Sequence, residues 1–161
     1  MEKNNIKEYA SNNNYRSVSF LFNEQKYEMN VSLYSNAILV FICHNGKVSN
    51  IYELNINMEE EQEANEFGLF GEDPGENLKD IDIAQCVLGT RGNEHMDFIA
   101  NFILSYIKEI IIKINSKINK ICLSLNLDNN LIKNIEDKNE VKNFLDITKD
   151  NIGKIFQVNI K

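Results

Sequence analysis

The heptapeptide AILVFIC at residues 37–43 is a continuous apolar run rich in β-branched side chains. A run this short favours a strand over a helix. Because every position is apolar, both faces of that strand are expected to be buried. The pair Asn45-Gly46 follows almost directly, and both residues tolerate a positive φ, which predicts a tight hairpin turn. The fold is therefore expected to build outward from a central strand.

Alternating apolar and polar residues lie on both sides of this run. Residues 16–22 and 27–33 precede it, and residues 48–56 follow the predicted turn. Alternation with a period of two indicates strands with one buried face. The short polar segments at 23–26 and 35–36 suit turns. The first half of the chain is therefore predicted to form a four-stranded antiparallel meander.

Two polar segments interrupt this pattern. Residues 1–14 are rich in Asn and predict a flexible tail before a single domain at 15–161. Residues 58–79 form an acidic loop, with eight Asp or Glu and no Lys or Arg between Met58 and Leu78. A loop of this length is either functional or disordered. We expect disorder, except at FGLF (67–70), whose rings are candidates for docking on the domain or on a partner.

The second half of the chain predicts two more strands and several helices. Residues 81–88 are typical of a strand, and ICLSLNL (121–127) alternates cleanly as another. Between them a helix is expected from about Glu94 to Ile114, with Asn93 as its N-cap. Its apolar stripe is assigned to the core and comprises Phe98, Phe102, Ile103, Tyr106, Ile107, Ile110, Ile111 and Ile114. Apolar residues from 141 to 156 indicate one or two further helices.

These elements predict an α+β fold whose six-stranded sheet is mostly antiparallel, in the order β-β-β-β-β-α-β-α, with two to three helices. Two long helices can cover one face of such a sheet. The run at 37–43, together with Ala84, Cys86 and Leu88, places apolar groups on the second face. That face is also semi-polar, because it carries Ser32, Ser49, Ser124 and Asn126. An exposed apolar patch usually marks an interface, so we expect this sheet face to be used for dimerisation.

Residues typical of catalysis or metal binding are scarce and scattered. His44 and His95 fall at the end of a strand and in the first turn of a helix. The sequence contains no nucleophile elbow, P-loop or dinucleotide-binding motif. Cys43, Cys86 and Cys122 are isolated within apolar runs, which predicts buried free thiols rather than a zinc site. We therefore expect no enzymatic activity, no cofactor and no metal.

Charge and hydropathy further limit the classes of partner that the chain is expected to bind. The formal net charge of −7 argues against nucleic acid, whose phosphates would repel the chain. The first residues lack the apolar segment of a signal peptide, and no run reaches the ~18 apolar residues of a membrane span. We expect a protein of the cytoplasm, and also of the nucleus, without a membrane partner.

Several stretches of the chain are similar to one known family. YSNAILVFICHNGKVSNIYEL (34–54) resembles the N-terminal half of the proteasome assembly chaperone 3 family, in its Ser-x-x-Ile-Leu-Val pattern and its later Asn-Gly-Lys hairpin. CVLG (86–89), with the following helix and ICLSLNL, resembles the second half. The sister family, proteasome assembly chaperone 4, has the same layout, and CLSLNLDN (122–129) is closer to it. The tail, the acidic loop and the longer C-terminus depart from both families.

This resemblance implies a non-enzymatic chaperone that pairs through its sheet, either with a second small assembly chaperone or with itself. It implies binding to proteasome α-type subunits while the α-ring of the 20S core particle assembles. Because loops at sheet ends often carry function, we expect Arg91, Asn93 and Glu94 to contact a partner. The alternative is another protein-interaction module, such as a longin- or profilin-like trafficking adaptor.

Overall fold

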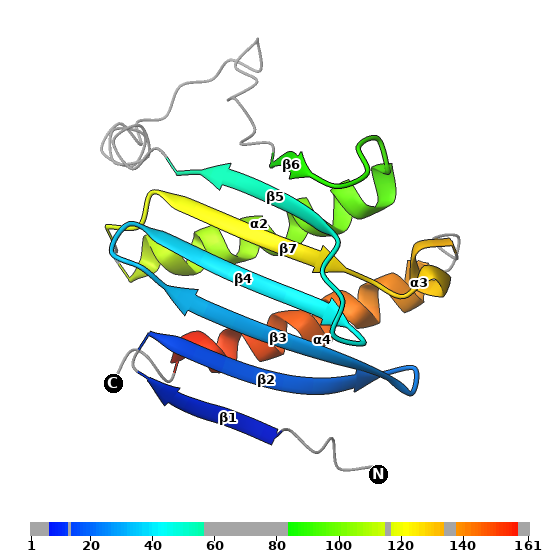
Figure 1. Ribbon diagram of the computed structural model, residues 1–161, viewed down its shortest axis with the longest axis horizontal. Helices are drawn as coiled ribbons and strands as arrows, with labels where there is room; N and C mark the ends of the chain where they lie inside the picture. The colour runs from blue at the N-terminus through cyan, green and yellow to red at the C-terminus, as the bar shows by residue number, and fades with distance from the viewer. Residues whose placement is uncertain (1–6, 13, 57–83, 115–116, 134–137, 158–161) are drawn as a thin grey trace, which may run out of the picture.

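The computed structural model describes residues 7–12, 14–56, 84–114, 117–133 and 138–157. It consists of one seven-stranded sheet with two long helices packed against one of its faces (Figure 1). The acidic loop at 58–79, including FGLF, lies outside the described residues, as do residues 81–83 of the strand predicted at 81–88. Its disorder therefore stays a prediction.

The order of elements confirms the predicted α+β class and adds one strand. The strands are β1 (Lys7–Asn12), β2 (Tyr15–Phe22), β3 (Gln25–Leu33), β4 (Ala37–His44), β5 (Asn50–Asn55), β6 (Gln85–Leu88) and β7 (Lys120–Asn126). The helices are α2 (Glu94–Lys113), α3 (Asn129–Lys133) and α4 (Lys138–Gln157). All described strand pairs are antiparallel except β4 with β7.

The additional strand falls in the segment predicted to be a flexible tail. β1 pairs antiparallel with β2, in a register that sets Lys7 opposite Ser19 and Ala10 opposite Arg16. Without β1, the outer edge of β2 would present a row of unpaired backbone N–H and C=O groups. The segment before β2 satisfies those groups even though its polar composition suggests a loop.

The predicted four-stranded meander is wrong in its last step. β2, β3 and β4 follow one another, but β7 lies between β4 and β5, and the sheet order is β1-β2-β3-β4-β7-β5-β6. The Asn45-Gly46 turn does form, with φ of 51° and 68°. Instead of returning alongside β4, the chain crosses to the far side of β7 (Figure 1).

The crossing follows from the composition of the strands. β4 is apolar at every position from Ala37 to Cys43, and it pairs in parallel with β7 through Ile38–Ile121 and Ile42–Leu125. A strand that is apolar on both faces is best placed in the middle of a sheet. β5 carries Glu53, so it suits a place nearer the edge.

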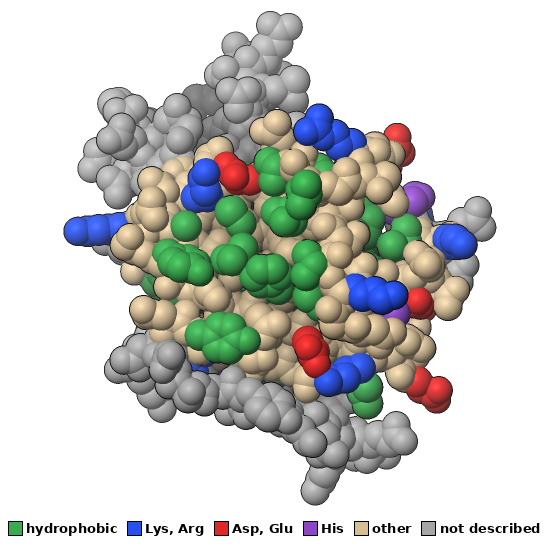
Figure 2. Space-filling model, viewed as in Figure 1, with side chains coloured by type: hydrophobic (Ala, Val, Ile, Leu, Met, Phe, Trp, Pro, Cys, Tyr) green, Lys and Arg blue, Asp and Glu red, His purple; other side chains and the backbone are tan. Residues whose placement is uncertain are grey.

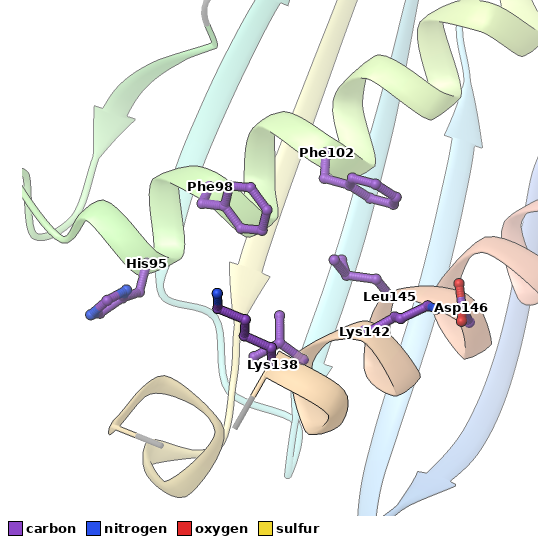
Figure 3. A pocket seen from close by; sticks show the side chains of 8 residues that line it. His95, Phe98, Phe102, Lys138, Lys142, Leu145 and Asp146 are labelled. Atoms are coloured by element: carbon purple, nitrogen blue, oxygen red, sulfur yellow. The ribbon is translucent and has the colours of Figure 1, made fainter. Parts of the chain in front are cut away.

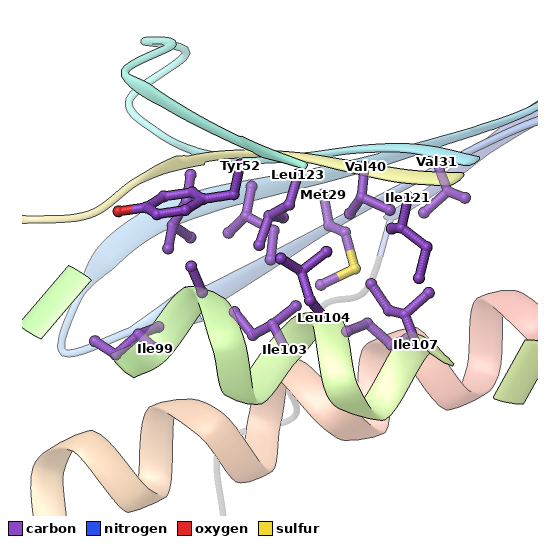
Figure 4. Packing of buried hydrophobic residues seen from close by; sticks show 14 of the residues in the cluster. Met29, Val31, Val40, Tyr52, Ile99, Ile103, Leu104, Ile107, Ile121 and Leu123 are labelled. Atoms are coloured by element: carbon purple, nitrogen blue, oxygen red, sulfur yellow. The ribbon is translucent and has the colours of Figure 1, made fainter. Parts of the chain in front are cut away.

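The core lies between the sheet and the two long helices. Figure 4 shows side chains of the sheet, among them Met29, Val40 and Tyr52, pointing toward α2. On α2, Ile103 and Ile107 are at most 2% exposed. Tyr52 donates a hydrogen bond from its hydroxyl to Asp97 Oδ1 at 2.9 Å. Burial is the main cause that raises the pKa of Tyr52, so the phenol stays neutral and can donate.

An aromatic cluster fixes α4 to the other half of the sheet. The ring of Phe144 on α4 lies 5.3 Å from those of both Phe22 and Tyr27 and 6.4 Å from that of Phe20, measured between centroids. The Phe20 and Tyr27 rings stack at 5.5 Å. Offset and edge-to-face pairs of this kind stabilise a core beyond the area that they bury.

Two expectations for α2 have different outcomes. Asn93 is the N-cap as predicted, because its side chain accepts a hydrogen bond from the Met96 amide at 3.2 Å. The assignment of Phe98 and Phe102 to the core is wrong, since they are 60% and 38% exposed. Ile114 is also exposed, at 39%. The apolar stripe of α2 is wider than the strip that the sheet can cover, so its margin faces outward.

We predict that Phe144→Ala lowers the free energy of unfolding by about 3–5 kcal/mol, because it removes a buried ring from a closely packed cluster. Urea denaturation followed by circular dichroism measures the effect. Leu21→Ala is the control, since Leu21 is 55% exposed, and it should change stability by less than about 0.5 kcal/mol. Similar losses in the two variants would contradict the role of the cluster.

Candidate functional site

The sheet face turned away from the helices is the first candidate site, and we call it the open sheet face. Strand pairing identifies its residues, because partners across neighbouring strands point to the same side. One row runs Ser17, Asn30, Phe41, Ser124, Ile51 and Leu88. The adjacent row runs Tyr15, Ser32, Leu39, Cys122, Glu53 and Gln85.

Four residues in these two rows form an apolar centre: Leu39, Phe41, Ile51 and Cys122. They come from β4, β7 and β5, three strands that the topology places side by side, and each is partly buried by its neighbours. Figure 2 shows hydrophobic side chains gathered in a band across the middle of this face. Among the described residues, both long helices lie on the opposite face of the sheet and no helix covers this one (Figure 1). An apolar band left open to water is typical of a protein interface.

The polar residues predicted for this face contribute less polarity than expected. Ser124 is 1% exposed, and it lies between Phe41 and Ile51 in the register. Asn126 donates its amide to the His44 carbonyl oxygen at 3.1 Å, so this donor group is already satisfied. The Tyr15 hydroxyl donates to Asn30 Oδ1 at 2.9 Å. Ser124 is already removed from water, although its Oγ has no hydrogen-bond partner among the described residues, and the Asn126 and Tyr15 donors are paired. A partner that covers these three side chains therefore costs little hydrogen bonding.

Two ion pairs flank the apolar centre. Lys120 Nζ lies 2.8 Å from Glu53 Oε1, and Lys26 Nζ lies 2.6 Å from Glu28 Oε1. The hydrogen bond to Glu53 is the main cause that raises the pKa of Lys120, which therefore stays charged. Exposed pairs such as these add little stability, but they can select and orient a partner.

The prediction that Ala84, Cys86 and Leu88 all lie on the second face of the sheet is wrong, because the pairing of β5 with β6 contains a bulge. The register pairs Ile51 with Leu88 but Tyr52 with Cys86, so β6 has one extra residue at this point. Leu88 therefore shares the open sheet face, where it is 61% exposed. Cys86 and the 8% exposed Ala84 pack on the core side instead. The sequence alternation predicted all three on the open face, because a bulge leaves no mark in such a pattern.

The thiols are also less buried than predicted. Only Cys43 of the three cysteines is fully buried, while Cys86 and Cys122 are intermediate, and all three are free. Burial raises the pKa of Cys122, and the nearby Glu53 carboxylate raises it further. The reactivity of the Cys122 thiol therefore measures how far the apolar centre is shielded from water.

The predicted contact residues Arg91, Asn93 and Glu94 lie together on the connection from β6 to α2. Arg91 and Glu94 are exposed, whereas Asn93 is half-buried as the N-cap of α2. The connection is fixed to β5, because Asn50 donates to the Thr90 carbonyl oxygen at 3.0 Å and accepts from the Thr90 amide at 3.1 Å. Their role in binding a partner stays a prediction.

Sequence reasoning missed the apolar centre as a set. Leu39 and Phe41 were within the predicted central strand, but Ile51 and Cys122 join them only through the placement of β7 between β4 and β5. The alternation within each strand could have assigned each residue to a face. The order of the strands could not be read from it.

The described residues contain neither a metal-binding cluster nor a membrane-spanning helix. There, no group of three or more His, Cys, Asp or Glu side chains is arranged to hold a metal ion. No helix in the described part of the chain is both long and apolar enough to cross a membrane.

Comparisons with known proteins give one informative result. No family model matches the chain, and no curated protein matches its sequence. A chain in the crystal structure of a novel chaperone complex for yeast 20S proteasome assembly is similar in structure, with a TM-score of 0.51. The match covers 84% of this chain and 96% of the yeast chain, at 15% sequence identity. The chain therefore shares its fold with a chain of a proteasome assembly chaperone complex, and the match does not separate the chaperone 3 type from the chaperone 4 type.

We predict that Cys122 in the isolated protein reacts with iodoacetamide about tenfold more slowly than glutathione at pH 7.5, because its thiolate is scarce and half-shielded. Because burial raises the pKa of Cys122, its rate should rise with pH toward a midpoint above that of glutathione. Mass spectrometry of the digested protein measures the modification at this residue. In urea the difference from glutathione should vanish, and equal rates in the folded protein would contradict the geometry described.

Proposed function

We propose that this protein is a non-enzymatic chaperone that pairs with a second small chaperone through the open sheet face and promotes assembly of the 20S proteasome α-ring by binding α-type subunits. The observation that carries the proposal is the apolar centre on the sheet face opposite the two long helices, which no helix of the described part of the chain covers. The fold shared with a chain of the yeast chaperone complex supports it.

The size of the open sheet face suits a dimer. Seven strands spaced about 4.8 Å apart, each roughly 20 Å long, present a face of about 700 Å². Specific interfaces bury about 800 Å² on each partner. The apolar centre would supply most of the affinity, and the ion pairs Lys26–Glu28 and Lys120–Glu53 would select the partner.

The part of the proposal that concerns α-type subunits rests on the sequence resemblance and on the shared fold. The resemblance implies both pairing through the sheet and binding of α-type subunits, so we assign the α-type subunits to a surface other than the open sheet face. On this chain the connection that carries Arg91, Asn93 and Glu94 is such a surface, since it lies at the end of the sheet. We place the protein in the cytoplasm, and also in the nucleus, where proteasome assembly would require it.

We predict that Phe41→Asp converts the dimer to a monomer, because it buries a carboxylate against the apolar surface of the partner. The measurement is the mass in light scattering after size exclusion, for the protein alone and co-expressed with a candidate second chaperone. Val48→Asp is the matched control, since Val48 is 57% exposed outside the sheet. A Phe41→Asp protein that keeps its melting temperature and its dimer would contradict the assigned interface.

We predict that the tagged protein recovers free α-type subunits and a second small chaperone from cells, but not mature particles. Arg91→Glu should lower the recovery of α-type subunits severalfold without changing the melting temperature, because it reverses an exposed charge beside Glu94. Mass spectrometry of the purified complexes measures both outcomes. Normal recovery by Arg91→Glu would remove this connection from the site, and recovery of membrane-trafficking proteins without α-type subunits would favour the adaptor alternative.

A further inference from the structure

A groove separates the outer surfaces of the two long helices. His95, Phe98 and Phe102 of α2 line one side, and Lys138, Val141, Lys142, Leu145 and Asp146 of α4 line the other. Figure 3 shows the two phenylalanine rings on the α2 side and the two lysines on the α4 side. The cavity measures about 560 Å³, within the roughly 300–1,000 Å³ typical of ligand sites.

The apolar part of the groove is open to water. Phe98 is 60% exposed and Phe102 is 38% exposed, and the largely buried Val141 and Leu145 lie opposite them. The sheet cannot cover these rings, because they lie on the side of α2 that faces away from the sheet. Large exposed aromatic side chains beside a cavity are typical anchors for a partner's apolar residues.

The edge of the groove is positively charged. Neither Lys138 nor Lys142 forms an ion pair with a carboxylate within the part of the chain that the structure describes. Lys149, further along α4, lies over the rings of Tyr106 and Phe102, with its Nζ 4.9 Å and 6.0 Å from their centroids. Asp146 is the acidic residue that lines the cavity.

The direction of the helices adds to this charge. α2 starts at Glu94 and α4 at Lys138, and the lining residues come from the first half of each helix. Both N-terminal ends therefore lie at the same end of the groove (Figure 3). The N-terminal end of a helix carries a partial positive charge that attracts carboxylates. Glu94 and Asp97 in the first turn of α2 and Glu140 in that of α4 offset part of this charge. The groove thus combines an apolar floor with a rim whose attraction for anions comes mainly from Lys138 and Lys142.

We propose that the groove between α2 and α4 binds a peptide segment of a partner protein in which large apolar side chains are flanked by Asp or Glu. The apolar side chains would rest against Phe98, Phe102 and Leu145, and the carboxylates would meet Lys138 and Lys142. The groove lies on the helix side of the sheet, so this contact is separate from pairing through the open sheet face and does not rest on it. The chain's own acidic loop at 58–79 has similar chemistry, and the experiment separates the two occupants.

The test is fluorescence anisotropy of the full chain with a labelled peptide, Glu-Asp-Phe-Ser-Leu-Leu-Asp-Glu. We expect saturable binding that weakens severalfold between about 50 mM and 500 mM salt, because exposed charges are screened. Two further peptides serve as controls: one with Lys in place of every acid, and one with Ser in place of every apolar residue. Equal binding of either control peptide, or no saturable binding, would overturn the proposal.

Charge-reversed variants locate the site. Lys138→Glu combined with Lys142→Glu should weaken binding about tenfold, since it turns two attractions into repulsions. The matched control reverses Lys113 and Lys154, which are exposed in the last turns of the same two helices. Equal losses in the two double variants would overturn the proposal. If the first variant is poorly folded, Lys138→Gln with Lys142→Gln replaces it and should still weaken binding severalfold.

Two more variants test the floor and the competing occupant. Phe98→Ser should weaken binding about tenfold, whereas Val48→Ser, at a similarly exposed position, should leave it unchanged. A chain that lacks residues 59–75 should bind the peptide as the full chain does. Binding at least about fivefold tighter by the shortened chain would assign the groove to the chain's own acidic loop and overturn the proposal.

Discussion

The parallel pairing of β4 with β7 is the contact on which the rest of the fold depends. It joins β4, which is apolar on both faces, to the apolar core side of β7, through Ile38–Ile121, Val40–Leu123 and Ile42–Leu125 on the side of the helices. On the other side the same pairing sets Leu39 beside Cys122. One set of backbone hydrogen bonds therefore builds the core and the apolar centre of the open sheet face at once. Any rearrangement that hid the centre would also separate the core residues.

This constraint explains which features could be predicted from the sequence. Strands and helices follow from local periodicity, and α2 begins and ends almost where its pattern and its N-cap Asn93 indicate. Strand order is a property of distant segments. The Asn45-Gly46 turn has the expected backbone, yet β5 crosses beyond β7, since the gain from pairing β4 with β7 outweighs a local hairpin.

The errors at individual residues have a related cause. An alternating pattern assumes that a strand keeps its period, so one extra residue in β6 moves Cys86 to the core side while Leu88 stays on the open face. The apolar stripe of a helix indicates which residues are apolar. It does not indicate how many of them the sheet covers. Phe98 and Phe102 lie outside the part that the sheet covers. In each case the missing information is the width or the register of the neighbouring element.

The symmetry of a sheet-to-sheet contact limits what a partner can be. In a two-fold homodimer both subunits use the same face, so Glu53 of one subunit must be matched by a group of the open sheet face of the other. Lys120 meets this condition. Because each Lys120–Glu53 pair is neutral, Glu53 of one subunit can pair with Lys120 of the other subunit across the two-fold axis. A second chaperone would need only a complementary charge and an apolar centre of its own. The apolar centre thus sets the strength of the contact, and the placement of the ion pairs around it determines whether a copy or a different chain fits better.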